Sequence, residues 1–530
     1  MGKNKRIYVL LFSIITLSMM LILRLFYIQI AQGDFFAQSA FLQKTGDMAE
    51  KVRGGIYDTN GESLTGNYTA SFAVISPNWL SLEEKQLLVE NNILDSIEDS
   101  NVENIPVTPE NSKILYSLIN KTPGLVIYEK DVRYGPEALA THVVGFQGQT
   151  GIEKAFNSFL ESNIKNYYVI NDGLGQPIVG ISLAQNKNKV KPWGVKLTID
   201  KDIQKIVEDI MDKRIEAGAV VVINAKSGEI LAMASRPNYK QFKLDEYLKQ
   251  ENAPLINRAV ESYTPGSIFK IVVLSATLEE KLADLDDVFF CNGFEKVGGN
   301  IFKCYSYEDG GHGELTLKDA LAYSCNSVFI QLGMRLGKDK ILEYARRLGL
   351  GEKTDIGLPE EKDGNIPLND EVFYQDIGNI SIGQGPIGIT PVQAAQMLLT
   401  IVNDGALKKP VLIKETIDSM GNTQVNLISH TEDKKVLSTE TAQKVKEALE
   451  AATEYGTGIR ANPQNSQTIG GKTGTAEIEN AISHAWFVGY YPADKPKVVI
   501  SVFVEHGGSG SVVAAPVFKE IINQISTIIN

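Results

Sequence analysis

The sequence predicts an α/β chain of the α+β type, in which a central antiparallel β-sheet is packed between helices and one transmembrane helix comes first. Three observations lead to this prediction. A long apolar segment lies near the N-terminus, pairs of apolar runs occur at both ends of the C-terminal part, and helical patterns lie between those pairs. Strands at both ends of a segment favour a single antiparallel sheet, whose edge the C-terminal strands would complete.

Length and charge limit the possible classes of protein. The chain has 530 residues, of which 43% are hydrophobic and 22% charged. This is too long for one hydrophobic core, so we expect at least two domains. The formal net charge is -12, whereas a protein that binds nucleic acid needs a clustered positive face. We therefore expect no nucleic-acid partner.

The N-terminus has the pattern of a membrane anchor. A basic tip is formed by Lys3, Lys5 and Arg6. An uncharged stretch follows from Ile7 to Leu23, and a second apolar run ends at Ile30. This length can cross a bilayer, and no small-x-small cleavage pattern follows directly. By the positive-inside rule we expect residues 1–6 in the cytoplasm, residues 7–30 as an uncleaved single-pass anchor in the cell membrane, and the C-terminal domains outside.

A domain boundary is predicted near residue 190, because the segment from Asn186 to Pro192 is polar, basic and ends in proline. A strand from Val195 to Ile199 and an amphipathic helix from Ile203 to Ile210 should follow. Two hairpins are predicted from apolar runs that flank turn residues, namely 219–223 with 230–234 and 485–490 with 497–504. A helix over about 516–528 closes the chain.

Three short motifs carry candidate chemistry, and each of them also occurs elsewhere by chance. The motifs are Ser267-x-x-Lys270, Ser324-x-Asn326 and Lys472-Thr473-Gly474, and the chance copies start at Ser162, Ser76 and Lys44. Only the copies that begin at Ser267, Ser324 and Lys472 run in the order serine–lysine, serine–asparagine, lysine–threonine–glycine and have suitable local structure.

The segment around Ser267 is typical of a nucleophile with a base. Pro265 and Gly266 predict a turn, and residues 268–274 form a helix that is apolar on nearly every side, hence buried. Lys270 lies one turn after Ser267 on the same face. Burial lowers the pKa of an ammonium group, and a neutral lysine beside a serine hydroxyl is a general base beside a nucleophile. The alternative is a lysine that extends from a core helix to the surface.

Ser324 and Asn326 follow a helix predicted to begin at Thr316, with Asp319 as its capping partner. In an extended loop their side chains would point the same way, so a hydroxyl and an amide could enter one cleft. The alternative is that Asn326 caps the C-terminus of that helix.

The segment from Thr468 to Ala476 is predicted as a strand with glycines at 470, 471 and 474. Glycines within a strand often mark the close approach of another backbone or of a ligand. Lys472 would raise the local positive potential, bind a substrate carboxylate and help to keep Lys270 deprotonated. The alternative is an ordinary edge strand with a solvated lysine.

Taken together, the three motifs resemble the penicillin-binding protein and serine β-lactamase superfamily. Further segments that share this resemblance are Leu197-Thr-Ile-Asp200 with Gln204, Ser235-Arg-Pro-Asn238, Gly383-Gln-Gly385 before Thr390-Pro391, and His484 to Gly489. The N-terminal part is similar to the pedestal of class B penicillin-binding proteins, which β-lactamases lack; the similar residues are Arg53 to Gly61, Arg133, His142 and Gly151-Ile-Glu153. Thr59 is a departure, since the family commonly carries arginine there in a local salt bridge.

The resemblance implies an elongated mixed α+β pedestal, similar to a dimerisation domain, over residues 31–190 and a penicillin-binding transpeptidase domain over residues 191–530. It also implies a serine-type D-Ala-D-Ala transpeptidase in peptidoglycan synthesis, cell-wall biogenesis and cell shape. Such an enzyme cross-links stem peptides ending in D-Ala-D-Ala through an acyl-enzyme, releases D-alanine, is inhibited covalently by β-lactam antibiotics and requires no cofactor for catalysis.

The roles of the site residues follow from the same resemblance. Ser267 is the nucleophile, Lys270 its base, Ser324 a proton shuttle and Asn326 a clamp on the substrate amide. Lys472 with Thr473 and Thr475 grips the substrate carboxylate on the strand that contains Gly474, and the backbone N–H groups of Ser267 and Thr475 form the oxyanion hole.

Three rival functions stay open. A bifunctional enzyme with a glycosyltransferase domain is disfavoured, because the residues before 190 lack the acidic, helical character of such a domain. A β-lactam sensor or a non-catalytic cell-wall scaffold is disfavoured by the intact motifs. A D,D-carboxypeptidase or endopeptidase would use the same acyl-enzyme and is poorly separated by sequence. The monofunctional interpretation implies a polytopic membrane glycosyltransferase as partner.

A structural zinc site is a further hypothesis, because Cys291, Cys304 and His312 lie between the first two motifs and thiolate and imidazole are favoured zinc ligands. The fourth ligand would be Asp287, Asp309 or water. The alternatives are a Cys291–Cys304 disulfide and unpaired thiols in a core. Cys325 is expected to face away from the cleft, since its neighbours face into it.

Overall fold

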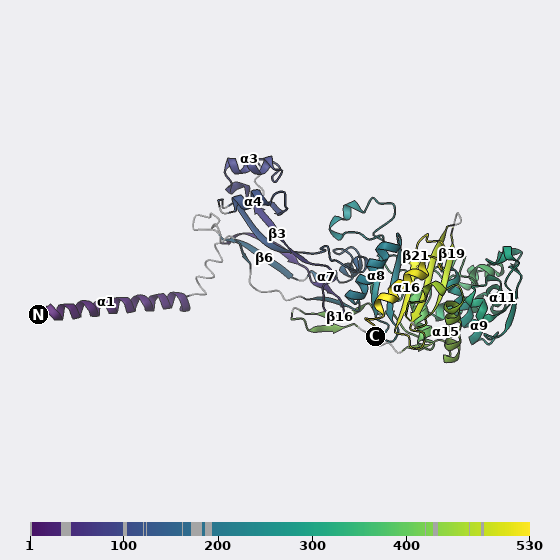
Figure 1. Cartoon of the computed structure of the whole chain (residues 1–530). Helices are drawn as coiled ribbons and strands as arrows, with labels where there is room; N and C mark the ends of the chain where they lie inside the picture. The colour runs from purple at the N-terminus through teal and green to yellow at the C-terminus, as the bar shows by residue number, and fades with distance from the viewer. Residues whose placement is uncertain are drawn as a thin grey trace. The chain divides into compact units, whose positions relative to one another are not determined.

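The computed structural model describes residues 3–32, 44–98, 103–119, 121–122, 124–161, 163–170, 183–185, 193–418, 420–427, 433–465, 467–478 and 482–529 (Figure 1). Backbone contacts divide the chain into two compact units. The first contains residues 1–53, 68–132 and 162–189, and the second contains residues 54–67, 133–161 and 190–530. The domain limits predicted from sequence, 31–190 and 191–530, stay predictions. Two segments from the N-terminal part, 54–67 and 133–161, pack with the second unit.

The first unit begins with α1 (Lys3–Phe26) and the short π-helix η1 (Tyr27–Ala31). Within α1, Ile7–Phe26 has a mean hydropathy of 2.4 and no part of it is buried inside the protein. An apolar helix of this length is suited to a lipid environment.

In its described residues, the rest of the first unit has two small sheets and two α-helices. One sheet has the order β1-β6-β7 and the other the order β4-β3-β5. Their strands are β1 (Lys44–Val52), β3 (Tyr68–Ile75), β4 (Glu103–Pro106), β5 (Leu125–Val132), β6 (Asn163–Ile170) and β7 (Leu183–Gln185). Helices α3 (Leu82–Glu90) and α4 (Ser112–Leu118) contribute Leu88, Leu115 and Leu118 to one core with Ala73 and Ile75 of β3.

The second unit is built on a five-stranded antiparallel sheet of order β10-β9-β21-β20-β19. Its strands are β9 (Gly218–Asn224), β10 (Ile230–Arg236), β19 (Gly470–Glu477), β20 (Ser483–Tyr491) and β21 (Val498–Val504). Both predicted hairpins are confirmed. The prediction that the C-terminal strands complete an edge is wrong for β21, which lies centrally between β9 and β20. The predicted strand at 195–199 is β8 (Gly194–Leu197), but it pairs with β2 (Gly55–Tyr57) and β16 (Ile413–Ile417) in a separate sheet.

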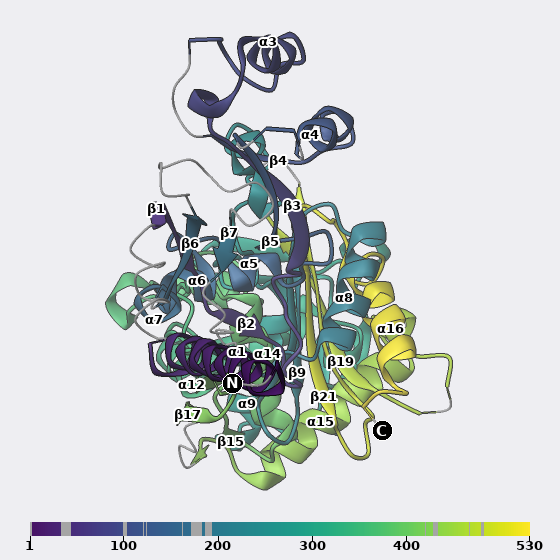
Figure 2. The same cartoon turned by 90° about the vertical axis from the view of Figure 1, so that its left-hand side faces the viewer.

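Helices cover both faces of the five-stranded sheet (Figure 2). Successive side chains of a strand point to opposite faces. Val220 and Val222 of β9 therefore pack in one core with α8 (Lys201–Arg214) and α16 (Ala514–Ile525), and the alternating Val221 packs in the other. The core that contains Val221 also includes residues of six helices, namely α9 (Lys270–Glu279), α10 (Leu317–Ala322), α11 (Asn326–Leu336), α12 (Lys338–Arg347), α14 (Pro391–Val402) and α15 (Thr439–Glu454). The predicted fold class is confirmed.

A buried polar network attaches the segment 133–161 to α8 and β10. Glu208 accepts a hydrogen bond from the backbone N–H of Ala140 at 2.7 Å and lies 3.2 Å from the guanidinium of Arg236. Arg236 also pairs with Asp212 at 2.5 Å. His142 of the same segment lies 2.8 Å from the carbonyl oxygen of Pro254 through Nε2. His142 and Arg236, two of the residues that carry the family resemblance, thus form stabilising contacts inside the second unit.

We predict that Arg236→Met lowers the free energy of unfolding by about 3–5 kcal/mol, because it leaves the buried Glu208 carboxylate unpaired. The double change Arg236→Met/Glu208→Leu should cost less than the sum of the single changes. Arg214→Met, which removes the exposed ion pair with Glu520, is the control and should cost less than about 1 kcal/mol. Chemical denaturation measures these three variants and the single change Glu208→Leu, and additive single effects would contradict the prediction.

His142 predicts a loss of stability in acid. Burial lowers the pKa of its imidazole from 6.5 to about 3, with smaller contributions from Arg236 and Arg258, against the opposing hydrogen bond to Pro254. The folded chain keeps the ring neutral, whereas the unfolded chain protonates it below about pH 6.5. The stability contributed above pH 6.5 should therefore fall as the pH drops toward 3. Thermal midpoints between pH 7 and 4 should fall less steeply in His142→Gln than in the wild-type protein, and an unchanged slope would contradict the prediction.

Candidate active site

Ser267 lies on the 3₁₀ turn η4 (Gly266–Phe269), directly before α9. The backbone N–H of Gly266 donates to the carbonyl of Gly383 at 2.9 Å. Gly266 has φ +56°, and an added Cβ would lie 2.4 Å from the carbonyl oxygen of Thr475. This position therefore requires glycine. The indole N–H of Trp486 donates to Thr264 at 3.0 Å, so strand β20 also supports the turn that carries the serine.

Lys270 is fully buried at the start of α9, as the apolar helix predicted. Its Nζ donates to the carbonyl of Ser324 at 2.6 Å, to Asn326 Oδ1 at 2.7 Å and to Ser324 Oγ at 3.2 Å. Burial lowers the pKa of Lys270 to about 8, while the thiols of Cys325 and Cys304 oppose this shift. The alternative of a lysine that extends to the surface is wrong.

Ser324 and Asn326 lie at the junction of α10 and α11. Thr316 caps α10 by accepting from the N–H of Asp319 at 3.1 Å, which confirms the predicted helix start. The expected extended loop is wrong, because Ser324 has φ +56° and Asn326 is the first residue of α11. So short a link between two helices uses a left-handed residue to turn the chain. Both side chains still reach Lys270.

The amine of Lys472 is enclosed within the fold. Its side chain is buried on β19, and Nζ donates to the carbonyl of Thr473 at 3.0 Å. Burial, followed by the charge of Lys270, lowers the pKa of Lys472 well below its usual value. The alternative of a solvated lysine is therefore wrong, although β19 is an edge strand.

The glycine at 474 marks a close approach, as predicted. An added Cβ would lie 2.9 Å from Ile268 and 3.0 Å from both the Pro265 carbonyl oxygen and Trp486. Strand β19 thus packs directly against the turn before Ser267.

A cavity of about 870 Å³ joins the three motifs. It is lined by Ser267, Ser324, Asn326, Thr473 and Thr475. Sequence reasoning missed several other lining residues, among them Ile301, Lys303, Tyr305, Thr457, Glu477 and Ser509. Gln384 also lines the cavity, and its flanking glycines in Gly383-Gln-Gly385 were a signal for it. Thr457 and Ser509 stand in no motif, so only the fold brings them here.

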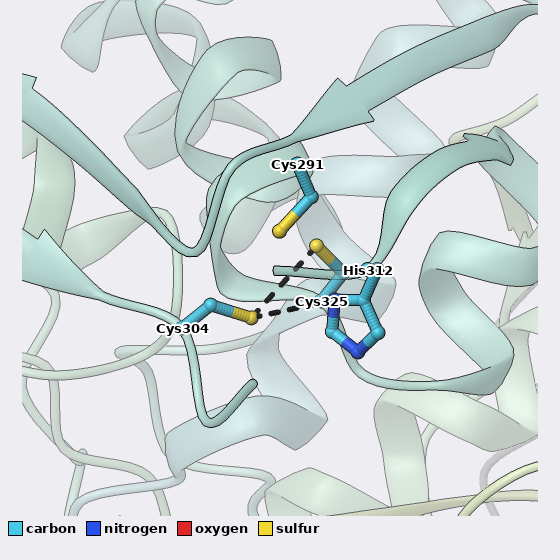
Figure 3. A group of neighbouring side chains, drawn as sticks. All are labelled: Cys291, Cys304, His312 and Cys325. Carbon is cyan, nitrogen blue, oxygen red and sulfur yellow. Dashed lines mark hydrogen bonds between the residues drawn. The ribbon is translucent and has the colours of Figure 1, made fainter. Parts of the chain in front are cut away.

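The three predicted metal ligands also lie together. Cys291, Cys304 and His312 form a group with Cys325, whose ligand atoms all lie within 4.8 Å of one another (Figure 3). The fourth member of this group is a thiol instead of the expected carboxylate of Asp287 or Asp309.

Residues 218–523 match the family model described as "Penicillin binding protein transpeptidase domain". This match covers more than half of the chain. The chain belongs to this family.

The chain is also similar to named relatives. It is 31% identical over 563 residues to stage V sporulation protein D of Bacillus subtilis, with 98% of this chain and 85% of that protein covered. It is 26% identical to the peptidoglycan D,D-transpeptidase MrdA of Acinetobacter baumannii, with 97% of this chain and 87% of that protein covered. A chain from a structure of a peptidoglycan synthase complex superposes with a TM-score of 0.72 at 25% identity, covering 98% of this chain and 97% of that one.

Proposed function

We propose that this protein is a membrane-anchored peptidoglycan D,D-transpeptidase that cross-links stem peptides through an acyl-enzyme on Ser267. The observation that carries the proposal is the cavity in which Ser267, Ser324, Asn326, Thr473 and Thr475 meet, with the buried amine of Lys270 hydrogen-bonded to Ser324 and Asn326 of that lining. Family membership supports the same activity. β-Lactams, which mimic the D-Ala-D-Ala end, would acylate the same serine.

The first half-reaction removes D-alanine. Ser267 Oγ attacks the carbonyl carbon of the penultimate D-alanine, and its proton passes to the free-amine form of Lys270. Ser324, whose Oγ lies 3.2 Å from Lys270 Nζ, relays a proton to the departing amine as the peptide bond breaks. Backbone N–H groups of Ser267 and Thr475 stabilise the oxyanion, and removal of one such donor costs about 2.7–4 kcal/mol in hydrolases. An acceptor amine then attacks the ester, restores the serine hydroxyl and completes the cross-link.

The terminal carboxylate of the donor peptide would bind at the Thr473 and Thr475 hydroxyls. Thr473 Oγ1 lies 2.7 Å from Thr457 Oγ1, which orients it at the cavity wall. Lys472 lies on the same strand but is enclosed, so Thr473 and Thr475 are the members of the expected carboxylate grip that line the cavity.

Carboxypeptidase or endopeptidase activity would use the same acyl-enzyme with water as acceptor. Product analysis with purified stem peptide, with and without an acceptor amine, separates the two outcomes. Cross-linked dimer should form in preference to hydrolysed tetrapeptide when the amine is present.

We predict that Ser267→Ala abolishes covalent labelling of the full-length protein by a fluorescent β-lactam. Lys270→Ala should lower the acylation rate at least about 100-fold, because general-base catalysis contributes on this order. The double variant should be barely worse than either single one, since these groups act as a unit. Ser162→Ala and Lys165→Ala, in the chance copy of the motif, are matched controls that should label normally. Labelling that survives Ser267→Ala would sink the nucleophile assignment.

The anchor and the pedestal are proposed to bind a polytopic membrane glycosyltransferase. A transpeptidase joins glycan strands that another activity makes, and the similar chain of a peptidoglycan synthase complex supports an assembly with such a partner. The basic tip would stay in the cytoplasm, which places the catalytic unit outside the cell.

We predict that replacing residues 7–30 with an unrelated transmembrane helix weakens co-purification with the glycosyltransferase, because contacts between the helices are lost. β-Lactam labelling should be unchanged in the same variant and serves as the control for folding. Co-purification that is insensitive both to this exchange and to deletion of the pedestal would contradict the proposed interface.

A further inference from the structure

Glu477 is the only carboxylate among the described residues that line the catalytic cavity. It is the last residue of β19 and lies on the same face of that strand as Thr473 and Thr475, because successive side chains point to opposite faces. The alternate residue Ala476 is buried in the core, whereas Thr475 and Glu477 are exposed. Glu477 therefore continues the row of side chains that would bind the terminal carboxylate of the donor peptide.

The carboxylate of Glu477 is available to a ligand. Within the described part of the chain, no ion pair and no hydrogen bond engages its oxygen atoms. The other charged side chain on the described cavity wall is Lys303, which lies 3.7 Å from the carboxylate of Glu308 and over the ring of Tyr307. A carboxylate that faces a cavity without a cationic partner favours a cationic group on the ligand.

Gln384 closes the main-chain edge of β19 at Glu477. With its amide oriented so that both polar atoms are paired, Gln384 donates to the carbonyl of Glu477 at 3.2 Å and accepts from the N–H of Glu477 at 2.9 Å. β19 is an edge strand, so an extended peptide can pair with its free main-chain groups only up to that point. The part of the donor that lies beyond its D-Ala-D-Ala end is therefore left to side-chain contacts.

The direction of the donor peptide determines which of its residues meets Glu477, and this step rests on the proposed function. The terminal carboxylate would lie at Thr473 and Thr475, and the scissile carbonyl at Ser267. The rest of the stem peptide then runs toward Glu477. Each residue of an extended peptide advances about 3.4 Å, which brings the third residue from the end beside the last residues of β19. In peptidoglycan stem peptides this third residue is a diamino acid, whose side chain is long enough to reach the carboxylate.

We propose that Glu477 binds the ω-ammonium group of the diamino acid in the donor stem peptide and thereby selects the donor. The carboxylate accepts a charge-assisted hydrogen bond from the ammonium group. The exposed side chains of Ile301 and Tyr305 line the same cavity and can pack on the methylene groups of the diamino acid. A stem peptide whose ω-amine is already part of a cross-link carries a neutral amide there. The enzyme therefore prefers donors that have not yet served as acceptors.

The amine of the acceptor peptide fits Glu477 less well. It attacks the acyl-enzyme from the position that the departing D-alanine vacates, because transfer reverses the path of the leaving amine. That position lies on the Thr473 side of the ester. The turn that carries Ser267 packs against residues 474–476, so Glu477 lies on the opposite side of the ester along β19.

The test compares two synthetic donors on the detergent-solubilised full-length protein. One is the pentapeptide L-Ala-γ-D-Glu-L-Lys-D-Ala-D-Ala, and the other carries Nε-acetyl-lysine in place of lysine. Release of D-alanine gives kcat/KM for acylation, which does not depend on the acceptor that follows. Wild type and the exposed control Glu216→Gln should prefer the lysine peptide about tenfold, since a hydrogen bond to a charged group contributes on this order. Glu477→Gln should lose this preference, and Glu477→Lys should invert it.

The ratio of the two kcat/KM values cancels any general loss of activity in a variant. A fall in Glu477→Gln that is equal for both peptides would overturn the proposal, because it would show a general role in positioning or in the activation of water. Equal use of both peptides by wild type would overturn it as well. If wild type releases no D-alanine from either peptide, the proposed function itself fails and this inference fails with it.

Discussion

The burial of the Lys270 amine is the constraint on which the site depends. An amine without contact to water is costly unless it is hydrogen-bonded, and the acceptors here come from the short segment Ser324–Asn326. That segment, which links α10 to α11, can reach Lys270 only when α11 packs against α9. The packing that lowers the pKa of Lys270 is therefore the same packing that brings the second motif to the first.

Close approaches at glycines position the remaining motif. Gly266 lies against the carbonyl of Thr475, Gly474 against the carbonyl of Pro265, and Gly383 against the carbonyl of Gly266. Each contact excludes a Cβ, so the backbone around Ser267 is fixed by neighbours from two distant parts of the chain. The contacts are made by main-chain atoms, so any side chain at these three positions would be too close to its neighbour, whatever its chemical type.

Local patterns predicted the local structure well, and non-local pairing was beyond them. The hairpins β9–β10 and β20–β21, the helix α8 and the buried start of α9 follow from periodicity and turn residues. The central position of β21, and the pairing of β8 in a separate sheet, depend on contacts between strands that lie far apart in sequence. The enclosure of Lys472 likewise depends on tertiary packing, because a K-T-G tripeptide has the same local pattern whether its lysine is solvated or buried.

Cys325 shows how a local argument can miss a second cluster of side chains. Its neighbours Ser324 and Asn326 face the catalytic cavity, so Cys325 was expected to face away from it. The structure places its sulfur on the other side of the segment, 3.9 Å from Cys304. Facing away from the catalytic cavity, the Cys325 thiol faces a group of three other side chains. The fold is needed to see this, because Cys291, Cys304 and His312 reach that side from the ends of β11 (Val288–Cys291), β13 (Asn300–Lys303) and β14 (Gly313–Thr316). One three-residue segment thus presents two polar side chains to the proposed chemistry and one thiol to the group formed by Cys291, Cys304 and His312.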